Sequence, residues 1–268
     1  MAIEVFSRYE KKYLLDENKY RYIIDRIDSH MIADKYSRGN EFYNIANIYY
    51  DTPDDALIRT SIEKPVYKEK LRLRSYGVPK LNDKVFLEIK KKYKGLVNKR
   101  RTKLRLSEAY ALTLDGVHPK ESDYINIQVL SEIEYFLNVY NLKPKVYLTY
   151  DRKAFFAEDD SDFRVTFDTN IRSRRENVRL EGGNYGELLI GNDLWLMEIK
   201  SSKAVPMWFT NLLSEVGAYP VTFSKYGTEY KKYISDNRMI KGDYKLCLPA
   251  YLGQQQIHRF PQQEHLYA

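Results

Sequence analysis

The chain has 268 residues but a single cysteine, Cys247, and only four histidines. One cysteine cannot form an intramolecular disulfide, so a disulfide scaffold is excluded and a reducing compartment is indicated. The histidines lack the spacing of metal ligands. No apolar run approaches the roughly 20 residues of a membrane helix, and the first residues do not resemble a signal peptide. These absences favour a cytoplasmic protein without a membrane segment.

Positive charge is the prominent property of the composition. The formal net charge is +7 and the calculated pI is about 9.1, which indicates an anionic partner such as nucleic acid, a phosphate compound or an acidic membrane. Hydrophobic residues make up 43% of the chain, enough for a folded core. The 25 tyrosines suit half-buried strands, so their number indicates packing rather than base stacking.

Three strand-like segments repeat a glutamate and a lysine two residues apart. The pairs are Glu10 with Lys12, Glu88 with Lys90, and Glu198 with Lys200. Residues two apart on a strand point to the same face, so each strand places an acid beside a base on one face and apolar residues on the other. Lys68, Lys70, Arg72 and Arg74 alternate in the same way, as do Arg164 and Asp168. The pattern predicts a surface that holds both a metal cation and a polyanion.

Helical patterns are fewer than strand patterns. They lie after Asp16, from about residue 124 to 140, and between Pro206 and Gly217. Many short strands with few helices predict an α+β protein with one antiparallel, barrel-like sheet. The charged strand faces could simply meet solvent. If helices cover the apolar faces, however, the charged faces point into the barrel, where an anionic ligand would compensate them.

The ordered series of motifs resembles the triphosphate tunnel metalloenzymes (CYTH-like proteins), and within them the vacuolar transporter chaperone-type polyphosphate polymerase domain. The matching segments are residues 8–13, 49–53, 71–77, 87–90, 150–155, 164–169, 197–200 and 223–226. The resemblance covers most of residues 3–234. It implies an antiparallel tunnel barrel of about eight strands with helices packed outside, in a domain of residues 1–238 followed by a C-terminal tail of residues 239–268.

The resemblance also implies functional residues. The side chains expected to bind phosphate are Lys12, Arg72, Arg74, Lys90, Arg152, Arg164, Lys200 and Lys225. Of these, Lys200, Arg74, Arg72 and Lys90 are the expected catalytic residues. Glu198 is the principal candidate ligand for Mn²⁺ or Mg²⁺, with Glu88 and Glu10 as further candidates. With Asp168, these residues are eight bases and four acids, and the surplus of four positive charges matches a nucleoside triphosphate.

Three functions remain open at this point. The first is a polymerase that moves the terminal phosphoryl group of ATP onto polyphosphate. The second is a triphosphatase acting on inorganic triphosphate or nucleotides; hydrolytic relatives carry a glutamate where this chain has Arg8, which counts against it. The third is a non-catalytic module that binds polyphosphate or nucleic acid. Nucleic acid is not expected as a partner, because no RNA-recognition or helix-turn-helix pattern is present. The sequence does not indicate the oligomeric state.

Overall fold

The structure is a computed structural model that describes residues 5–6, 9–37, 41–94 and 96–240. Its contacts divide the chain into two units, residues 1–231 and residues 232–268, and each is described by itself. The sheet, the helices that cover it and the candidate site all belong to the first unit. Residues 239 and 240 end a helix, and the rest of the predicted tail lies outside the described residues.

The described part of the chain forms one antiparallel sheet with helices, as predicted. The strands are β1 (Val5–Phe6), β2 (Tyr9–Asp16), β3 (Met31–Ala33), β4 (Tyr43–Asp51), β5 (Tyr67–Tyr76), β6 (Lys84–Tyr93), β7 (Leu96–Arg105), β8 (Lys143–Ala157), β9 (Arg164–Arg174), β10 (Glu187–Leu188) and β11 (Leu194–Ser201). The order is β1-β7-β6-β5-β4-β8-β9-β11-β2, with β10 beside β9 and β3 beside β8. The α+β class is therefore confirmed.

Within the strands that the structure describes, the sheet does not close into a continuous barrel, so the sequence prediction of a closed barrel is wrong. The hydrogen-bonded path begins at β1, which pairs with β7, and ends at β2, which pairs with β11. No pairing joins the two end strands among the described residues. The physical reason is local: β1 and β2 follow one another in the chain, and β1 contributes only two residues to its ladder. The sheet is open in its hydrogen bonds.

Six helices are described: α1 (Glu17–Ile27), α2 (Ala56–Ile62), α3 (Leu106–Asp115), α4 (Ile127–Tyr140), α5 (Met207–Glu215) and α6 (Lys225–Ile240). Asp16 caps α1 as predicted, because its carboxylate accepts a hydrogen bond from the Lys19 amide at 2.9 Å. Pro206 lies one position before α5 rather than at its first residue, and Gly217 follows with a φ of +59°. None of these helices has both the length and the apolar character needed to cross a membrane.

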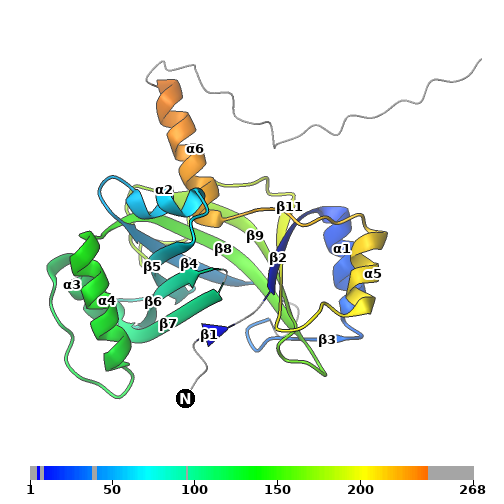
Figure 1. The fold of residues 1–268 in the computed structure, drawn as a ribbon, viewed down its shortest axis with the longest axis horizontal. Helices are drawn as coiled ribbons and strands as arrows, with labels where there is room; N and C mark the ends of the chain where they lie inside the picture. Colours follow the sequence, from blue (N-terminus) through cyan, green and yellow to red (C-terminus); the bar gives the residue numbers. More distant parts are fainter. Residues whose placement is uncertain (1–4, 7–8, 38–40, 95, 241–268) are drawn as a thin grey trace, which may run out of the picture. The chain divides into compact units, whose positions relative to one another are not determined.

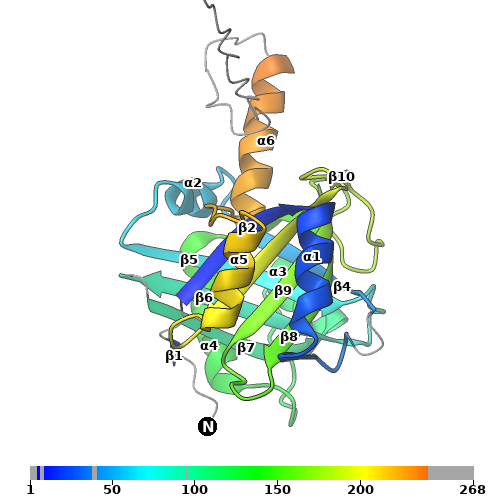
Figure 2. The same cartoon turned by 90° about the vertical axis from the view of Figure 1, so that its right-hand side faces the viewer.

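Two separate apolar cores lie between the sheet and its helices. On β2, β9 and β11, the outward side chains include Leu15, Phe167 and Met197, and they pack against α1 and α5. On β4 to β7, Leu73 and Leu87 belong to a second cluster that packs against α3 and α4. Figure 1 shows these two helix pairs beside different parts of the sheet, and Figure 2 shows α1 and α5 running together across their strands. The opposite, charged strand faces therefore form an inner surface, as predicted.

Part of this inner surface is apolar, which the sequence did not predict. Tyr49 shares a strand face with Asn47, and Tyr49 packs in a third cluster with Leu148 and Leu196. Tyr226, near the start of α6, stacks on Tyr49 with ring centroids 4.8 Å apart, and its hydroxyl donates to Asp51 at 3.0 Å. The charged inner residues are consequently split into two walls, one on β5 to β7 and one on β2, β8, β9 and β11.

Candidate functional site

The wall formed by β5, β6 and β7 carries cations in register across three strands. Arg72 lies opposite Glu88, and Arg101 lies opposite Glu88 on its other side. One step along the strands, Lys90 lies between Lys70 and Lys99. Directly opposed residues of antiparallel strands point to the same face, so these side chains all meet the inner surface. We refer to this set of inner residues on β5 to β7 as the cationic wall.

Glu88 is the carboxylate at the centre of the cationic wall, with 1% of its surface exposed. Its oxygens lie 2.7 Å from Arg72 Nε, 2.8 Å from Lys99 Nζ, 3.8 Å from Arg74 Nε and 4.0 Å from Arg101 Nη1. Burial alone would raise the pKa of Glu88, but Arg72, Arg74 and Lys99 outweigh it and hold the pKa far below its usual range. Glu88 is therefore an ionised anchor that fixes the surrounding cations.

Arg74 is held by neutral partners rather than by an acid alone. Its Nε donates to Asn47 Oδ1 at 3.0 Å, and its Nη2 donates to the Tyr150 hydroxyl at 3.4 Å. Only 8% of Arg74 is exposed. Burial raises the pKa of Tyr150, but Arg152, Arg74 and Lys225 reverse the effect, so the net pKa is lowered. The guanidinium is positioned while most of its charge stays available to an anion.

On the facing wall, Lys12, Lys200, Lys225 and Arg152 each lie beside a carboxylate. Glu198 on β11 lies 3.4 Å from Lys12, 3.4 Å from Lys225 and 3.4 Å from Lys200. Lys12 also lies 3.2 Å from Glu10. Burial opposes ionisation of Glu198, but the three lysines overcome it, so the pKa of this carboxyl lies well below its ordinary value. We refer to the inner residues of β2, β8, β9 and β11, together with Lys225, as the balanced wall.

Asp168 completes the balanced wall. Its two oxygens accept hydrogen bonds from Arg152, one from Nε at 2.6 Å and one from Nη2 at 2.7 Å. Lys225 Nζ donates to the same carboxylate, which is fully buried. This bidentate pairing orients the Arg152 guanidinium and leaves its remaining donors to the inner surface. Asp168 is thus a positioning residue rather than a free acid.

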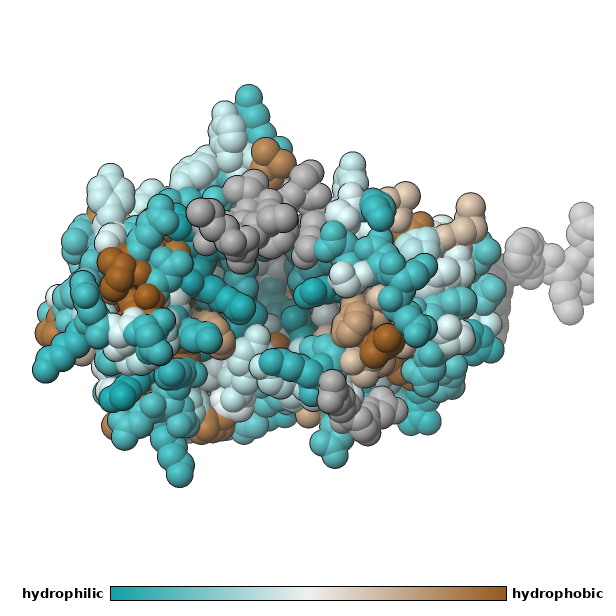
Figure 3. Space-filling model, turned by 90° about the horizontal axis from the view of Figure 1, so that it is seen from below, coloured by the Kyte–Doolittle hydropathy of each residue, from teal (hydrophilic) through white to brown (hydrophobic). Residues whose placement is uncertain are grey.

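The two walls lie close enough to influence each other. Burial raises the pKa of Glu10, while Lys200 beside it and Lys90 across from it contribute to a net lowering. Lys12 on β2 likewise contributes to the lowered pKa of Lys70 on β5. Seen from below, the molecule is hollowed near its centre, and hydrophilic residues surround the hollow (Figure 3). The inner surface is therefore a charged lumen between the walls.

Three lysines of the cationic wall carry more positive charge than their surroundings compensate. Burial, together with Lys90 and Lys68, lowers the pKa of Lys70 to about 7. Burial also lowers the pKa of Lys90 to about 8 and that of Lys99 to about 7, although Glu10 and Glu88 act in the opposite direction. Mutual repulsion of this kind is relieved when an anion enters. The row formed by Lys70, Lys90 and Lys99 is thus prepared for a polyanion.

The structure brings together nearly all of the residues expected from the sequence. The residues that line the lumen are Lys12, Arg72, Arg74, Lys90, Arg152, Lys200, Lys225, Glu10, Glu88 and Glu198. Arg164 shares the inner strand face but is exposed, and its Nε donates to the Ser161 carbonyl at 3.1 Å. It lies opposite Lys200 at one end of the lumen. Arg8, which distinguished the enzyme alternatives, lies outside the described residues.

Sequence reasoning missed Lys70, Lys99 and Arg101 as site residues. Lys70 belongs to a strand whose alternation was recognised, and it lies two residues before Arg72. Lys99 and Arg101 belong to β7, whose basic residues also alternate through Lys103 and Arg105. The signal was present, but Arg100 lies between Lys99 and Arg101 and conceals the two-residue period.

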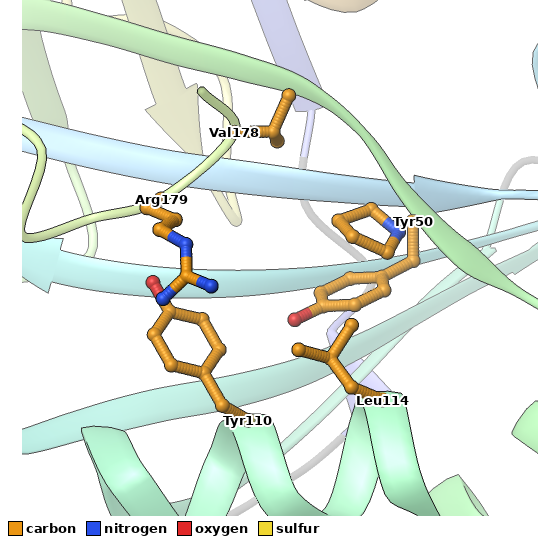
Figure 4. A pocket seen from close by; sticks show the side chains of 6 residues that line it. Tyr50, Tyr110, Leu114, Val178 and Arg179 are labelled. Carbon is orange, nitrogen blue, oxygen red and sulfur yellow. The ribbon is translucent and has the colours of Figure 1, made fainter. Parts of the chain in front are cut away.

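A pocket of about 210 Å³ lies outside the lumen, between α3, β4 and the segment after β9 (Figure 4). Tyr50, Tyr110, Leu114 and Arg179 line it, and none of them was expected to bind phosphate. The Tyr110 hydroxyl donates to Glu181 at 2.7 Å and accepts from the Leu180 amide at 2.8 Å. Tyr50 is hydrogen-bonded to Thr113. These partners indicate a packing gap on the outer side of the sheet rather than the reaction site.

The sequence model of the VTC domain matches residues 7–234, so the chain belongs to the VTC domain family. It is 26% identical over 201 residues to vacuolar transporter chaperone complex subunit 4 of Schizosaccharomyces pombe, covering 67% of this chain and 28% of that protein. The same subunit of Trypanosoma cruzi is 27% identical over 216 residues, covering 66% of this chain and 27% of that protein.

A solved structure supports the assignment of the fold. It is that of a Bacillus halodurans protein assigned as an adenylate cyclase, with a TM-score of 0.50 and 15% sequence identity. The match covers 83% of this chain and 96% of that one. Since this chain spans little more than a quarter of the length of the curated relatives, the similarity identifies a shared domain. The similarity at this level of identity concerns the fold alone.

The resemblance described for the sequence motifs implies a divalent metal. No group of three or more His, Cys, Asp or Glu side chains is arranged to hold a metal ion in the described part of the chain. Mg²⁺ is commonly held by one or two carboxylates together with the substrate phosphates. Glu10 and Glu198 lie near enough for each to act on the charge of the other. The lysines nearest to Glu10 and Glu198 stand at 3.2 to 3.4 Å, which fits such a shared site. The oxygens of Glu88 are held more tightly, at 2.7 Å from Arg72 and 2.8 Å from Lys99.

Proposed function

We propose that this domain is a metal-dependent polyphosphate polymerase that transfers the terminal phosphoryl group of ATP to a growing polyphosphate chain. The observation that carries the proposal is the cationic wall, in which Lys70, Lys90 and Lys99 lie opposite one another on three adjacent strands. Such a row is unfavourable without an anion and suits a ligand that carries a charge on every repeat. Polyphosphate has that property.

The roles of the side chains follow from their contacts. Arg72 and Arg74 would bind phosphate oxygens through planar guanidinium groups held in place by Glu88 and Asn47. Lys90 and Lys200, from opposite walls, would neutralise charge that shifts between phosphate oxygens as the phosphoryl group moves. Phosphoryl transfer depends mainly on positioning and electrostatic stabilisation, so covalent participation of the protein is not required.

Glu198 would hold the metal, with Glu10 as a second ligand. When bound, Mg²⁺ or Mn²⁺ supplies a Lewis acid that neutralises charge on the phosphate oxygens. Glu198 would fulfil this role from the balanced wall, where Lys12, Lys200 and Lys225 keep it ionised. The three lysines also prevent the carboxylates from repelling the incoming triphosphate. Glu88 is proposed to remain a structural anchor for the arginines.

The acids of the lumen favour a phosphate acceptor over water. The pKa values of Glu10, Glu88, Asp168 and Glu198 are all lowered, since nearby cations outweigh the effect of burial. Each carboxylate is therefore a weak base at neutral pH, and efficient general bases have pKa values nearer the working pH. The end of a polyphosphate chain is already ionised and needs no deprotonation. This difference supports the polymerase over the triphosphatase alternative.

The test is a phosphorus NMR time course of the protein with ATP, Mg²⁺ and a short polyphosphate primer. Resonances of internal phosphates should grow in step with ADP. Orthophosphate as the sole product would assign the domain to the hydrolases, and unchanged ATP would overturn the enzymatic proposal.

The matched variants are Arg74→Ala and Arg179→Ala. Arg74→Ala should reduce chain growth by more than about a hundredfold, which is the size of effect of removing one donor that stabilises a transition state. Its fold should survive, because Asn47 and Tyr150 are neutral partners. Arg179 lines the outer pocket, so its replacement should leave the rate unchanged. Equal losses in the two variants would contradict the assignment of the lumen as the reaction site.

A further inference from the structure

Four aromatic side chains gather at one end of the lumen, beyond the cations. Tyr43, Tyr76 and Phe86 lie on the same strand faces as Asn47, Arg74 and Glu88, and Tyr36 packs against them. The ring centroids of Tyr36 and Tyr76 are 5.2 Å apart with an interplanar angle of 10°, which is an offset stack. Phe86 meets Tyr76 edge-on at 6.0 Å, and Tyr43 lies 5.4 Å from Tyr36. We refer to these four residues as the aromatic rim.

The aromatic rim differs from the other stacked aromatics of the molecule in its exposure. Trp195 stacks on Tyr20 with centroids 3.6 Å apart, but both side chains are at least 92% buried and belong to the core under α1. Tyr36 and Tyr76, by contrast, are 48% and 39% exposed. A stacked pair that keeps this much surface open at the end of a charged channel is available to another flat ring.

Cations accompany the rim. The Arg101 guanidinium lies 4.7 Å from the centre of the Phe86 ring, and Lys35 Nζ lies 4.8 Å from the centre of the Tyr36 ring. Arg152 lies directly opposite Tyr43 on the neighbouring strand. Aromatic faces interleaved with basic side chains are the composition that proteins use to bind bases and their attached phosphates together.

The order of residues along β5 gives this site a direction. On β5 the inner residues run Lys70, Arg72, Arg74 and Tyr76, and a strand rises about 3.3 Å per residue, so Tyr76 lies roughly 7 Å beyond Arg74. On the balanced wall, Arg152 lies opposite Tyr43 and also opposite Asp168. Lys90 lies within electrostatic reach of Glu10 and Lys200. On β5 the aromatic ring, the arginines and the lysine therefore follow one another in that order, from Tyr76 to Lys70.

We propose that the aromatic rim binds the base of the nucleoside triphosphate by stacking, with the triphosphate extending past Arg74 and Arg152 toward the lysine row. This inference rests on the proposed function for the nature of the substrate, and it adds a base-binding site to the phosphate site. The terminal phosphate then points toward Lys90, which lies within electrostatic reach of Glu10 and Lys200. A base that stacks without edge-specific partners is bound in proportion to its ring area, so purines bind more tightly than pyrimidines.

The experiment measures binding without turnover, by calorimetry in EDTA, with ATP, UTP and inorganic triphosphate as the three probes. The variants are Tyr36→Leu, Tyr76→Leu and the double variant, which keep apolar bulk but remove the ring. Loss of one stacking contact should weaken ATP binding between roughly fivefold and a hundredfold, while the affinity for inorganic triphosphate stays within about twofold. Tyr135→Leu is the control, because Tyr135 is 72% exposed on α4, away from the rim.

The outcomes separate the rim from the proposed function. Equal weakening of ATP and inorganic triphosphate in the rim variants would overturn the base-binding site, as would unchanged ATP binding or equal affinities for ATP and UTP. Selective loss of ATP affinity would support it even if the NMR experiment gave no polyphosphate, in which case the catalytic proposal alone would fail. A wild-type protein that bound none of the three probes, in EDTA or with Mg²⁺, would overturn both proposals.

Discussion

The two walls of the lumen use similar residues to different ends. On the cationic wall, burial and Lys90 lower the pKa of Lys70 to about 7, and burial, Arg72 and Arg74 lower that of Lys99 to about 7. On the balanced wall, Lys225 lies between Asp168 and Glu198, and its pKa is raised because these acids outweigh burial. A lysine is thus kept partly neutral on one side of the lumen and firmly charged on the other.

This difference suggests separate roles for the two walls, one in binding the polyanion and one in holding the metal. A wall with uncompensated cations gains stability when a polyanion enters, so it favours binding. A wall with compensated charge gains little free energy when a polyanion enters. Its ionised carboxylates lie beside cations, so it can hold a metal without repelling phosphate. The two walls together could bind a metal–triphosphate complex from opposite sides. Substitutions that exchange their charge balance test this division.

The largest effect is expected from Glu198→Gln on the balanced wall. The variant removes the principal proposed metal ligand, and a metal ion contributes several kcal/mol to charge stabilisation. Chain growth should fall about a thousandfold, with at least a tenfold higher Mg²⁺ concentration needed for half-maximal rate. The measurement is a metal titration of ADP release. If the variant needs the same Mg²⁺ concentration as the wild type, the metal does not bind Glu198, and the role assigned to the balanced wall is wrong.

Glu88→Gln on the cationic wall should act on stability instead. It removes the charge that Arg72 and Lys99 contact at 2.7 and 2.8 Å, and breaking a buried ion pair costs roughly 3 kcal/mol or more. Urea unfolding should show this loss at neutral pH. Inorganic triphosphate should restore part of it, because the ligand replaces the missing negative charge. If instead the variant kept its stability and lost its metal dependence, the roles assigned to the two glutamates would be reversed.

The walls themselves could be predicted from the sequence because their strands alternate strictly. Glu88 and Lys90 alternate with Leu87 and Ile89, and Glu198 and Lys200 alternate with Met197 and Ile199, so one face of each strand had to be charged. The helices that cover the other faces followed from their own apolar spacing. The alternation of the strands and the apolar spacing of the helices were therefore enough to predict most of the fold and most of the candidate site residues.

The contrast between the walls could not be predicted in the same way, since it depends on register. Lys99 contacts Glu88 only because the β6–β7 ladder places Lys99 opposite Lys90 and Arg101 opposite Glu88. The third apolar cluster was also hidden: β4 is buried on both faces, so Tyr49 and Tyr50 show no alternation of polarity. The aromatic rim joins Tyr36 to strands distant in sequence, and abundant tyrosine alone did not reveal it.

The smallest effect, and the most direct test of the cationic wall, is expected from Lys70→Met. Lys70 has a pKa near 7 in the folded protein, below the value near 10.4 of an unfolded chain. Between these values the unfolded state binds more protons, so the contribution of Lys70 to stability becomes less unfavourable as the pH rises. The variant should therefore be more stable than the wild type by about 1 kcal/mol at pH 6 to 7, with a gap that narrows toward pH 9. Thermal unfolding across this range measures it, with exposed Lys120→Met as the control.

Binding should respond to Lys70→Met in the opposite direction. A bound polyanion favours the protonated lysine, so triphosphate binding takes up protons and the affinity of the wild type should fall as the pH rises from 7 to 9. In Lys70→Met this pH dependence should be smaller, and the affinity at pH 7 weaker by a few-fold. If Lys70→Met gains stability but loses affinity, the wild-type wall gives up stability of the free protein in order to bind its ligand. A variant that lost both would show instead that Lys70 is a packing residue, and that the cationic wall is compensated by contacts as fully as the wall it faces.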